Sequence, residues 1–178
     1  MSTPNKDLDK VDVRIKWDPS PSGAPAHDLD IIAATYLAEA PYGSPAYLVH
    51  FDSRSPDGTI TLNRDSRTGQ GLGFDEEMTL ELDRLSSAYS RVLVGVAIQQ
   101  RDGRLTFAGI ANTGVQVREG YSVLAEDDFS SVGTATAAVV AEFARSASGA
   151  WEFHRGVRGF DGDPDSFTTT MGNRTSGA

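Results

Sequence analysis

A succession of short β-prone segments, each bounded by turn residues, most constrains the fold of this chain. Residues 11–17 and 78–82 alternate apolar and polar side chains, as half-buried strands do. Residues 91–99 are strongly apolar and typical of a central strand, whereas residues 29–37 suit either a buried strand or a short helix. Short strands with closely spaced turn signals predict a mainly β fold, an antiparallel two-sheet β-sandwich.

Further segments extend this pattern, with one exception. Strands are also expected over residues 46–51, 59–62, 105–111, 114–118, 121–124 and 151–155. The exception is residues 134–147, which are rich in Ala and place Val139, Val140 and Phe143 at helical spacing before Gly149. This segment predicts one packed helix near the C-terminal third.

The length and composition indicate one domain. The chain has 178 residues, 39% of them hydrophobic and 23% charged, which is ordinary for a soluble globular protein. Residues 1–10 are predicted to be a flexible tail, residues 11–167 the β-sandwich domain, and residues 168–178 a second flexible tail.

Charge and cysteine content exclude several classes of function. A net charge of −9 argues against nucleic-acid binding, which needs a basic face. The absence of cysteine excludes disulfides, thiolate catalysis and zinc–thiolate sites. Neither a signal-peptide core nor an apolar run of about 20 residues is present, so a cytoplasmic protein without a membrane span is expected.

The most specific chemical signal is the loop of residues 63–77. Gly69, Gly71 and Gly73 allow positive φ and sharp turns. The side chains around them carry hard oxygen donors: Asp65, Ser66, Thr68, Asp75, Glu76 and Glu77. Such a loop predicts a site for a hard cation such as Ca²⁺.

Two other acidic elements extend the candidate site. Asp28 and Asp30 are two residues apart, so in an extended chain both face the same side and reach one ion. Asp52 ends an expected strand and is therefore predicted to point at the same site. Residues 161–165 imitate the start of an EF-hand loop, but Ser166 and Gly172 stand where that loop needs Gly and Glu, so a polar tail segment is predicted.

Common catalytic motifs are missing from the sequence. It contains no G-x-S-x-G nucleophile elbow, no P-loop and no dinucleotide-binding fingerprint, and its three histidines are scattered. A carboxylate pair for glycoside hydrolysis stays open, because sequence does not reveal the separation of two carboxylates.

Taken in order, these pieces resemble the TerD family of bacterial tellurium-resistance and calcium-binding stress proteins. The resemblance covers residues 13–172. It rests on Trp17-Asp18, Asp28-Leu-Asp-Ile-Ile-Ala33, Ser55-Pro-Asp-Gly58, Asp65 to Glu76, Phe107-Ala-Gly-Ile-Ala-Asn112, Thr134-Ala-Thr-Ala137 and Trp151-Glu-Phe153. It implies a β-sandwich that holds Ca²⁺ in acidic loops at one end, takes part in tellurite and chemical stress response, and is not an enzyme.

The chain departs from the family pattern within the loop. Ser66 replaces an Asn, and Leu72 and Phe74 replace aspartates, while Asp52 replaces an Asn at the end of the preceding strand. Ca²⁺ affinity follows the number of charged ligands, so losing two carboxylates removes one ion or weakens binding. Leu72 and Phe74 would instead form a small exposed apolar patch for a partner.

Two hypotheses follow from these features. The first is a non-catalytic protein that binds Ca²⁺ between two loops, acting in stress response with protein partners. Its ligand set is Asp28, Asp30, Asp52, Asp65, Ser66, Thr68, Asp75 and Glu76. The alternative is a metal-independent interaction module of the same fold with a degenerate site.

Overall fold

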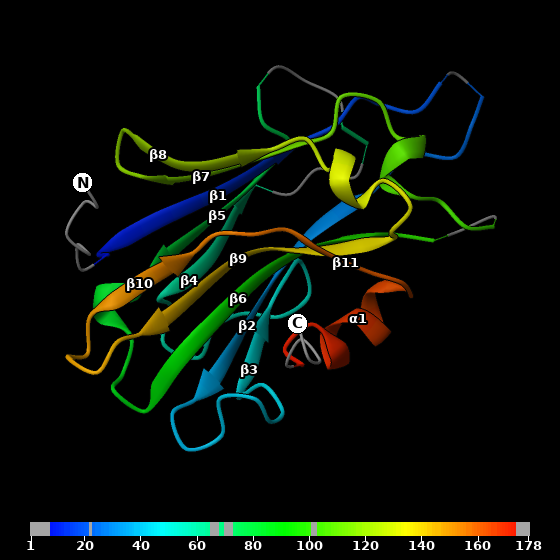
Figure 1. The fold of residues 1–178 in the computed structure, drawn as a ribbon. Coiled ribbons are helices and arrows are strands. Elements are labelled where there is room, and N and C mark those ends of the chain that lie inside the picture. The colour runs from blue at the N-terminus through cyan, green and yellow to red at the C-terminus, as the bar shows by residue number, and fades with distance from the viewer. Residues whose placement is uncertain (1–7, 22, 65–67, 70–72, 101–102, 174–178) are drawn as a thin grey trace.

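Alternating side chains along the strands produce a sandwich of two antiparallel sheets, as the computed structural model shows (Figure 1). It describes residues 8–21, 23–64, 68–69, 73–100 and 103–173. Sheet A has the order β4 (Ile60–Arg64), β5 (Glu76–Glu81), β1 (Lys10–Lys16), β7 (Gly114–Glu119) and β8 (Ser122–Asp127). Sheet B has the order β10 (Trp151–His154), β9 (Ala137–Arg145), β6 (Tyr89–Ile98), β2 (Leu29–Leu37) and β3 (Tyr47–Val49), and β11 (Arg158–Phe160) also pairs with β9. The predicted fold class is confirmed.

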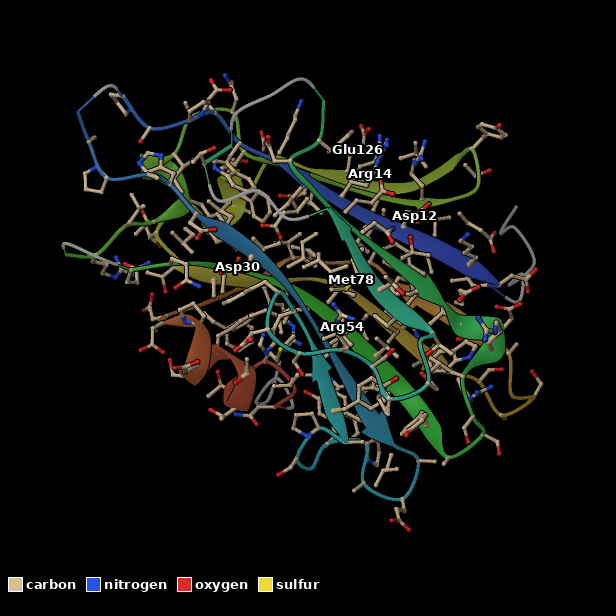
Figure 2. All side chains as sticks on the ribbon, turned by 180° about the vertical axis from the view of Figure 1, so that it is seen from behind. Asp12, Arg14, Asp30, Arg54, Met78 and Glu126 are labelled. Carbon is tan, nitrogen blue, oxygen red and sulfur yellow. The ribbon has the colours of Figure 1, made fainter. Side chains whose placement is uncertain are left out.

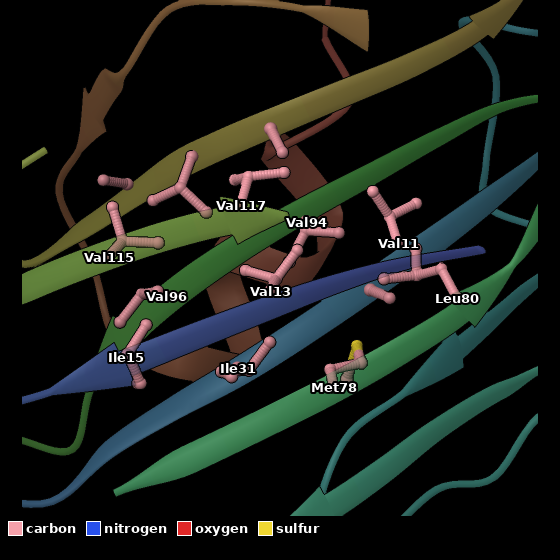
Figure 3. Packing of buried hydrophobic residues seen from close by; sticks show 14 of the residues in the cluster. Val11, Val13, Ile15, Ile31, Met78, Leu80, Val94, Val96, Val115 and Val117 are labelled. Atoms are coloured by element: carbon pink, nitrogen blue, oxygen red, sulfur yellow. The ribbon is translucent and has the colours of Figure 1, made fainter. Parts of the chain in front are cut away.

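The main core lies between the two sheets. Val11, Val13 and Ile15 alternate along β1, and all three are fully buried. Figure 3 shows them packed with residues of β5, β2, β6 and β7. Burial of each such side chain stabilises the folded state by about 1.5–3 kcal/mol. The alternation of buried and outward-facing residues along β1 therefore sets its register against β5 and β7.

A second cluster covers the outer face of sheet B. The helix α1 (Pro164–Thr170) lies across this face (Figure 1). Phe167 packs on Gly95, where a Cβ would come within 2.5 Å of the Phe167 ring. Buried residues of β2, β6 and β9 complete the cluster. Because these strands are covered on both faces, they read as continuous apolar runs in the sequence.

The helix predicted over residues 134–147 is wrong. This segment contains β9, which pairs with β6, β10 and β11. Its residues Ala137–Ala141 are all buried, and a register shift between Val94 and Gly95 of β6 marks an irregularity opposite them. Sheet A covers one face and α1 the other, so the apolar run reflects two-sided burial rather than helical amphipathicity.

Residues 105–111 do not form the predicted strand. They contain the 3₁₀ turn η2 (Phe107–Gly109), and two further turns are η1 (Leu82–Arg84) and η3 (Ser130–Val132). The Phe107 ring stacks on Phe129, with ring centroids 4.5 Å apart. The backbone N–H of Phe107 donates to Ala135. These contacts hold η2 in place as a turn, and the segment adds no strand to either sheet.

The segment 161–165 forms part of an ordered element rather than a polar tail. Asp163 caps α1, since its Oδ1 accepts a hydrogen bond from the Ser166 backbone N–H at 2.9 Å. Met171 follows α1 and is fully buried, and residues 174–178 of the predicted C-terminal tail lie outside the described part of the chain. At the other terminus Leu8 is buried, and residues 1–7 lie outside the described part of the chain. Within the described ranges, no helix has the length and apolar character needed to cross a membrane.

Candidate metal centre

Three buried carboxylates converge where the two sheets meet at one end of the sandwich. Asp28 and Asp30 lie at the start of β2 in sheet B, and Glu76 begins β5 in sheet A. One oxygen from each lies within 4.8 Å of the others. The three residues are 8%, 3% and 0% exposed. All three are among the metal ligands predicted from the sequence, in which Asp30 and Glu76 are 46 positions apart.

Backbone and amide donors orient the cluster. The Ile31 backbone N–H donates to Glu76 Oε1 at 3.1 Å, which links β2 to β5 across the sandwich. Gln99 Nε2 donates to Asp30 Oδ2 at 2.5 Å, and the Gln99 backbone N–H donates to the Asp28 carbonyl at 2.8 Å. Gln99 was not predicted, because a single amide after an apolar strand carries no distinguishing signal.

Asp75 has different hydrogen-bond partners from its neighbour Glu76. Its Oδ2 accepts a hydrogen bond from the Trp17 backbone N–H at 2.8 Å, and its own N–H donates to Ile15. The Trp17 indole N–H in turn donates to the carbonyl of His27, the residue before Asp28. Trp17 thus connects the strand bearing Asp75 and Glu76 to the loop bearing Asp28.

Within the described part of the glycine loop, Gly69 packs directly against the Trp17 side chain. Gly69 and Gly73 have φ of +75° and +79°, the left-handed region that the sequence predicted for this loop. A Cβ on Gly69 would lie 2.5 Å from the Trp17 indole nitrogen, so only glycine fits there. Thr68 is partly buried beside it. The predicted ligands Asp65 and Ser66, together with Gly71 and Leu72, lie outside the described residues.

Asp52 lies outside the three-carboxylate cluster. It occupies an exposed turn after β3, where its backbone N–H donates to His50 Nδ1 at 3.2 Å. It lines a cavity of about 360 Å³ that Asp30 also reaches, together with Asp163 and Asp165 near the start of α1. In Figure 2, Asp30 lies on the side of the molecule that carries α1.

Phe74 and Glu77, which flank Asp75 and Glu76 in the sequence, both contact Arg14 on sheet A. Phe74 is half-buried, and the Arg14 guanidinium lies 4.2 Å from the centre of its ring. Arg14 also approaches Glu77 at 3.8 Å. Figure 2 shows Arg14 on β1 near Asp12 and Glu126. Phe74 therefore packs under a cation on sheet A, and Leu72, the other residue of the apolar patch expected from sequence, lies outside the described residues.

The donor set of the cluster suits a hard divalent cation. Ca²⁺ takes about six to eight oxygens at roughly 2.3–2.6 Å, so two of its ligands lie at most about 5 Å apart. The separation of the three carboxylates meets that limit. Buried like charges repel one another, and a cation between them offsets both the repulsion and the loss of solvent. The residues present therefore fit a bound Ca²⁺.

Fold and site together define a two-sheet β-sandwich with an acidic cluster at one end. The model of the TerD domain matches residues 1–169, and the chain belongs to the TerD family. A solved homologue of telluride resistance protein (TerD) from Streptomyces coelicolor A3(2) is 62% identical, with a TM-score of 0.92, and the match covers 94% of this chain and 99% of that one.

Relatives with curated names are more distant. The tellurium resistance protein TerD of Alcaligenes sp is 27% identical over 164 residues, which cover 87% of this chain and 83% of that protein. General stress protein 16U of Bacillus subtilis (strain 168) is 22% identical over 178 residues, covering 97% of this chain and 92% of that protein. The family resemblance found in the motifs is thereby confirmed.

Proposed function

We propose that this protein binds Ca²⁺ through Asp28, Asp30 and Glu76 and acts without catalysis in the response to tellurium compounds and chemical stress. The convergence of these three buried carboxylates supports the proposal most directly. The names of the relatives support the role in resistance and stress. We place the protein in the cytoplasm, acting with protein partners in a stress-response complex.

Bound Ca²⁺ would act as a cross-link between the sheets. Asp30 belongs to sheet B, Asp28 directly precedes its strand β2, and Glu76 belongs to sheet A, so one ion shared by them joins β2 to β5. Asp65, Ser66 and Thr68 are proposed to add oxygens from the glycine loop, with water completing the shell. Because the ion binds the folded chain, it stabilises that state by mass action.

Calorimetric titration of metal-free protein with Ca²⁺ tests the proposal. The wild type is expected to bind saturably and to gain about 2.7 kcal/mol of unfolding free energy at 100 times the dissociation constant. Glu76→Gln removes a charge from the cluster and should weaken Ca²⁺ binding at least about tenfold, which corresponds to 1.4 kcal/mol. The matched control is Glu77→Gln, whose side chain faces Arg14 on the other side of β5.

Three results would contradict this proposal. Equal affinities of the Glu76 and Glu77 variants would place the ion elsewhere. A melting temperature unmoved by millimolar Ca²⁺ or by chelator would favour the metal-independent interaction module. Turnover in a screen of glycosides and phosphoesters, lost on Glu76→Gln, would instead indicate a carboxylate hydrolase.

A further inference from the structure

A second charged cavity lies at the opposite end of sheet B from the acidic cluster. Its volume is about 560 Å³, and Arg91, Arg155, Arg158, Glu142, Tyr42 and Asn173 contribute to its lining. Asp30 pairs with Ala97 and Tyr36 pairs with Arg91 along the β2–β6 ladder. Six residues of strand separate these positions, which is about 20 Å. The cavity is therefore distinct from the proposed metal centre.

Arg91 lines this cavity with a guanidinium that is held in place by several contacts. It is only 4% exposed; its Nε donates to Glu142 at 3.2 Å, and its Nη1 donates to the carbonyls of Pro41 and Gly172 at 3.0 and 2.9 Å. The Tyr42 ring lies 4.6 Å from the guanidinium. In the part of the chain that the structure describes, Nη2 of Arg91 has no acceptor. A held guanidinium with an unused donor is a preorganised anion contact.

Arg155 and Arg158 add positive charge that is not neutralised locally. Arg155 is exposed in the turn between β10 and β11, and Arg158 is half-buried at the start of β11. Among the described residues, neither guanidinium forms an ion pair with a carboxylate. Three arginines thus surround one carboxylate, Glu142, in a chain of net charge −9.

We propose that this cavity binds a multivalent oxyanion of the phosphate class, either inorganic phosphate or the phosphate group of a small organic molecule. Arginine presents paired N–H donors that match phosphate oxygens. Arg91 supplies the fixed contact, while Arg155 and Arg158 close on the anion from the β10–β11 turn. The amide of Asn173 and the hydroxyl of Tyr42 are further donors at the rim.

The test is calorimetric titration of metal-free protein at constant ionic strength, with inorganic phosphate and with phenyl phosphate as probes. The wild type should bind at least one probe saturably, and the tighter probe identifies the source of the phosphate group. Arg155→Ala and Arg158→Ala should each weaken binding about tenfold, as expected for loss of one charged hydrogen-bonding group. Arg91 is left intact because its contacts support the fold.

The matched control is Arg54→Ala. Arg54, labelled in Figure 2, is exposed and does not line the cavity, and its replacement by Ala changes the net charge by the same amount. Its variant should bind phosphate with unchanged affinity. Failure of both probes to saturate, or equal weakening by Arg54→Ala, would overturn the proposal. Calcium binding is measured separately, so either assignment can fail without the other.

Discussion

The two ends of the β2–β6 ladder handle buried charge in opposite ways. At one end Arg91 meets Glu142, two carbonyls and an aromatic ring, all within the protein. At the other end Asp28, Asp30 and Glu76 bring like charges together. A buried charge surrounded by complementary groups supports the fold, whereas a group of like charges is suited to an external counter-ion. Arg91 therefore supports the fold through Nε and Nη1 and leaves only Nη2 for the proposed anion, whereas the three carboxylates depend on an external counter-ion.

The largest expected effect comes from Arg91→Leu. It leaves Glu142 without its partner and the Pro41 and Gly172 carbonyls without a donor, so the unfolding free energy should fall by about 3 kcal/mol. In metal-free buffer, Glu76→Gln should cost less than about 1 kcal/mol, because it also relieves repulsion. Urea denaturation of both variants measures the difference. Equal losses of unfolding free energy in Arg91→Leu and Glu76→Gln would show that the two ends do not differ in how their charges support the fold.

Gly95→Ala tests the packing of Phe167 on β6, between the Arg91 end and the acidic end of the β2–β6 ladder. The new Cβ would lie 2.5 Å from the Phe167 ring and 3.1 Å from the Ala138 carbonyl, so α1 must move. Overpacking of this kind costs about 1–3 kcal/mol. Gly133→Ala is the control, since its nearest neighbour is at 3.4 Å. Thermal denaturation should separate the two; an unchanged melting temperature for Gly95→Ala would mean that α1 is not held on the sheet.

The smallest effect is expected at the α1 cap. The hydrogen bond from the Ser166 backbone N–H, aided by the Ser166 hydroxyl, lowers the pKa of Asp163 below its ordinary value. Its stabilising contribution is therefore full above that ordinary value and is lost as pH falls through the lower folded-state pKa. Asp163→Ala should be slightly destabilised at pH 7, with the difference from wild type shrinking below about pH 4.

Asp163→Asn serves as the matched variant, since Asn retains an oxygen that caps a helix. Its stability at pH 7 should lie between those of the wild type and Asp163→Ala. A difference between wild type and Asp163→Ala that grows on acidification would contradict the assigned cap.

Much of the fold was predictable because most strands keep one face in solvent. β1 and β5 alternate clearly and were found. β9 was mistaken for a helix because Ala and Val fill both of its faces, which removes the period of two. The signal for α1 was present, since Asp163 followed by Pro164 is a typical helix start, but the segment was interpreted as a polar tail once the EF-hand pattern failed.

The candidate site was predictable only in part. Its carboxylates stood out because each occurs in an acidic or glycine-rich motif. Gln99 reaches Asp30 from 69 positions away along the chain, a proximity that arises only from pairing of β2 with β6. The basic cavity has the same origin, because Arg91, Arg155 and Arg158 are brought together by the strand pairing of sheet B and not by any local sequence pattern.

Trp17 gives the metal centre an optical reporter. Its backbone N–H donates to the Asp75 carboxylate, its indole N–H donates to the His27 carbonyl, and its ring lies against Gly69. The loop before β2 and the glycine loop therefore both contact the Trp17 indole. The chain has two tryptophans, and Trp151 stacks under Arg145 far from this junction in sheet order. In a Trp151→Phe background, emission would come from Trp17 alone. Any rearrangement that tightens the two loops would then register as a change in fluorescence of the unlabelled protein.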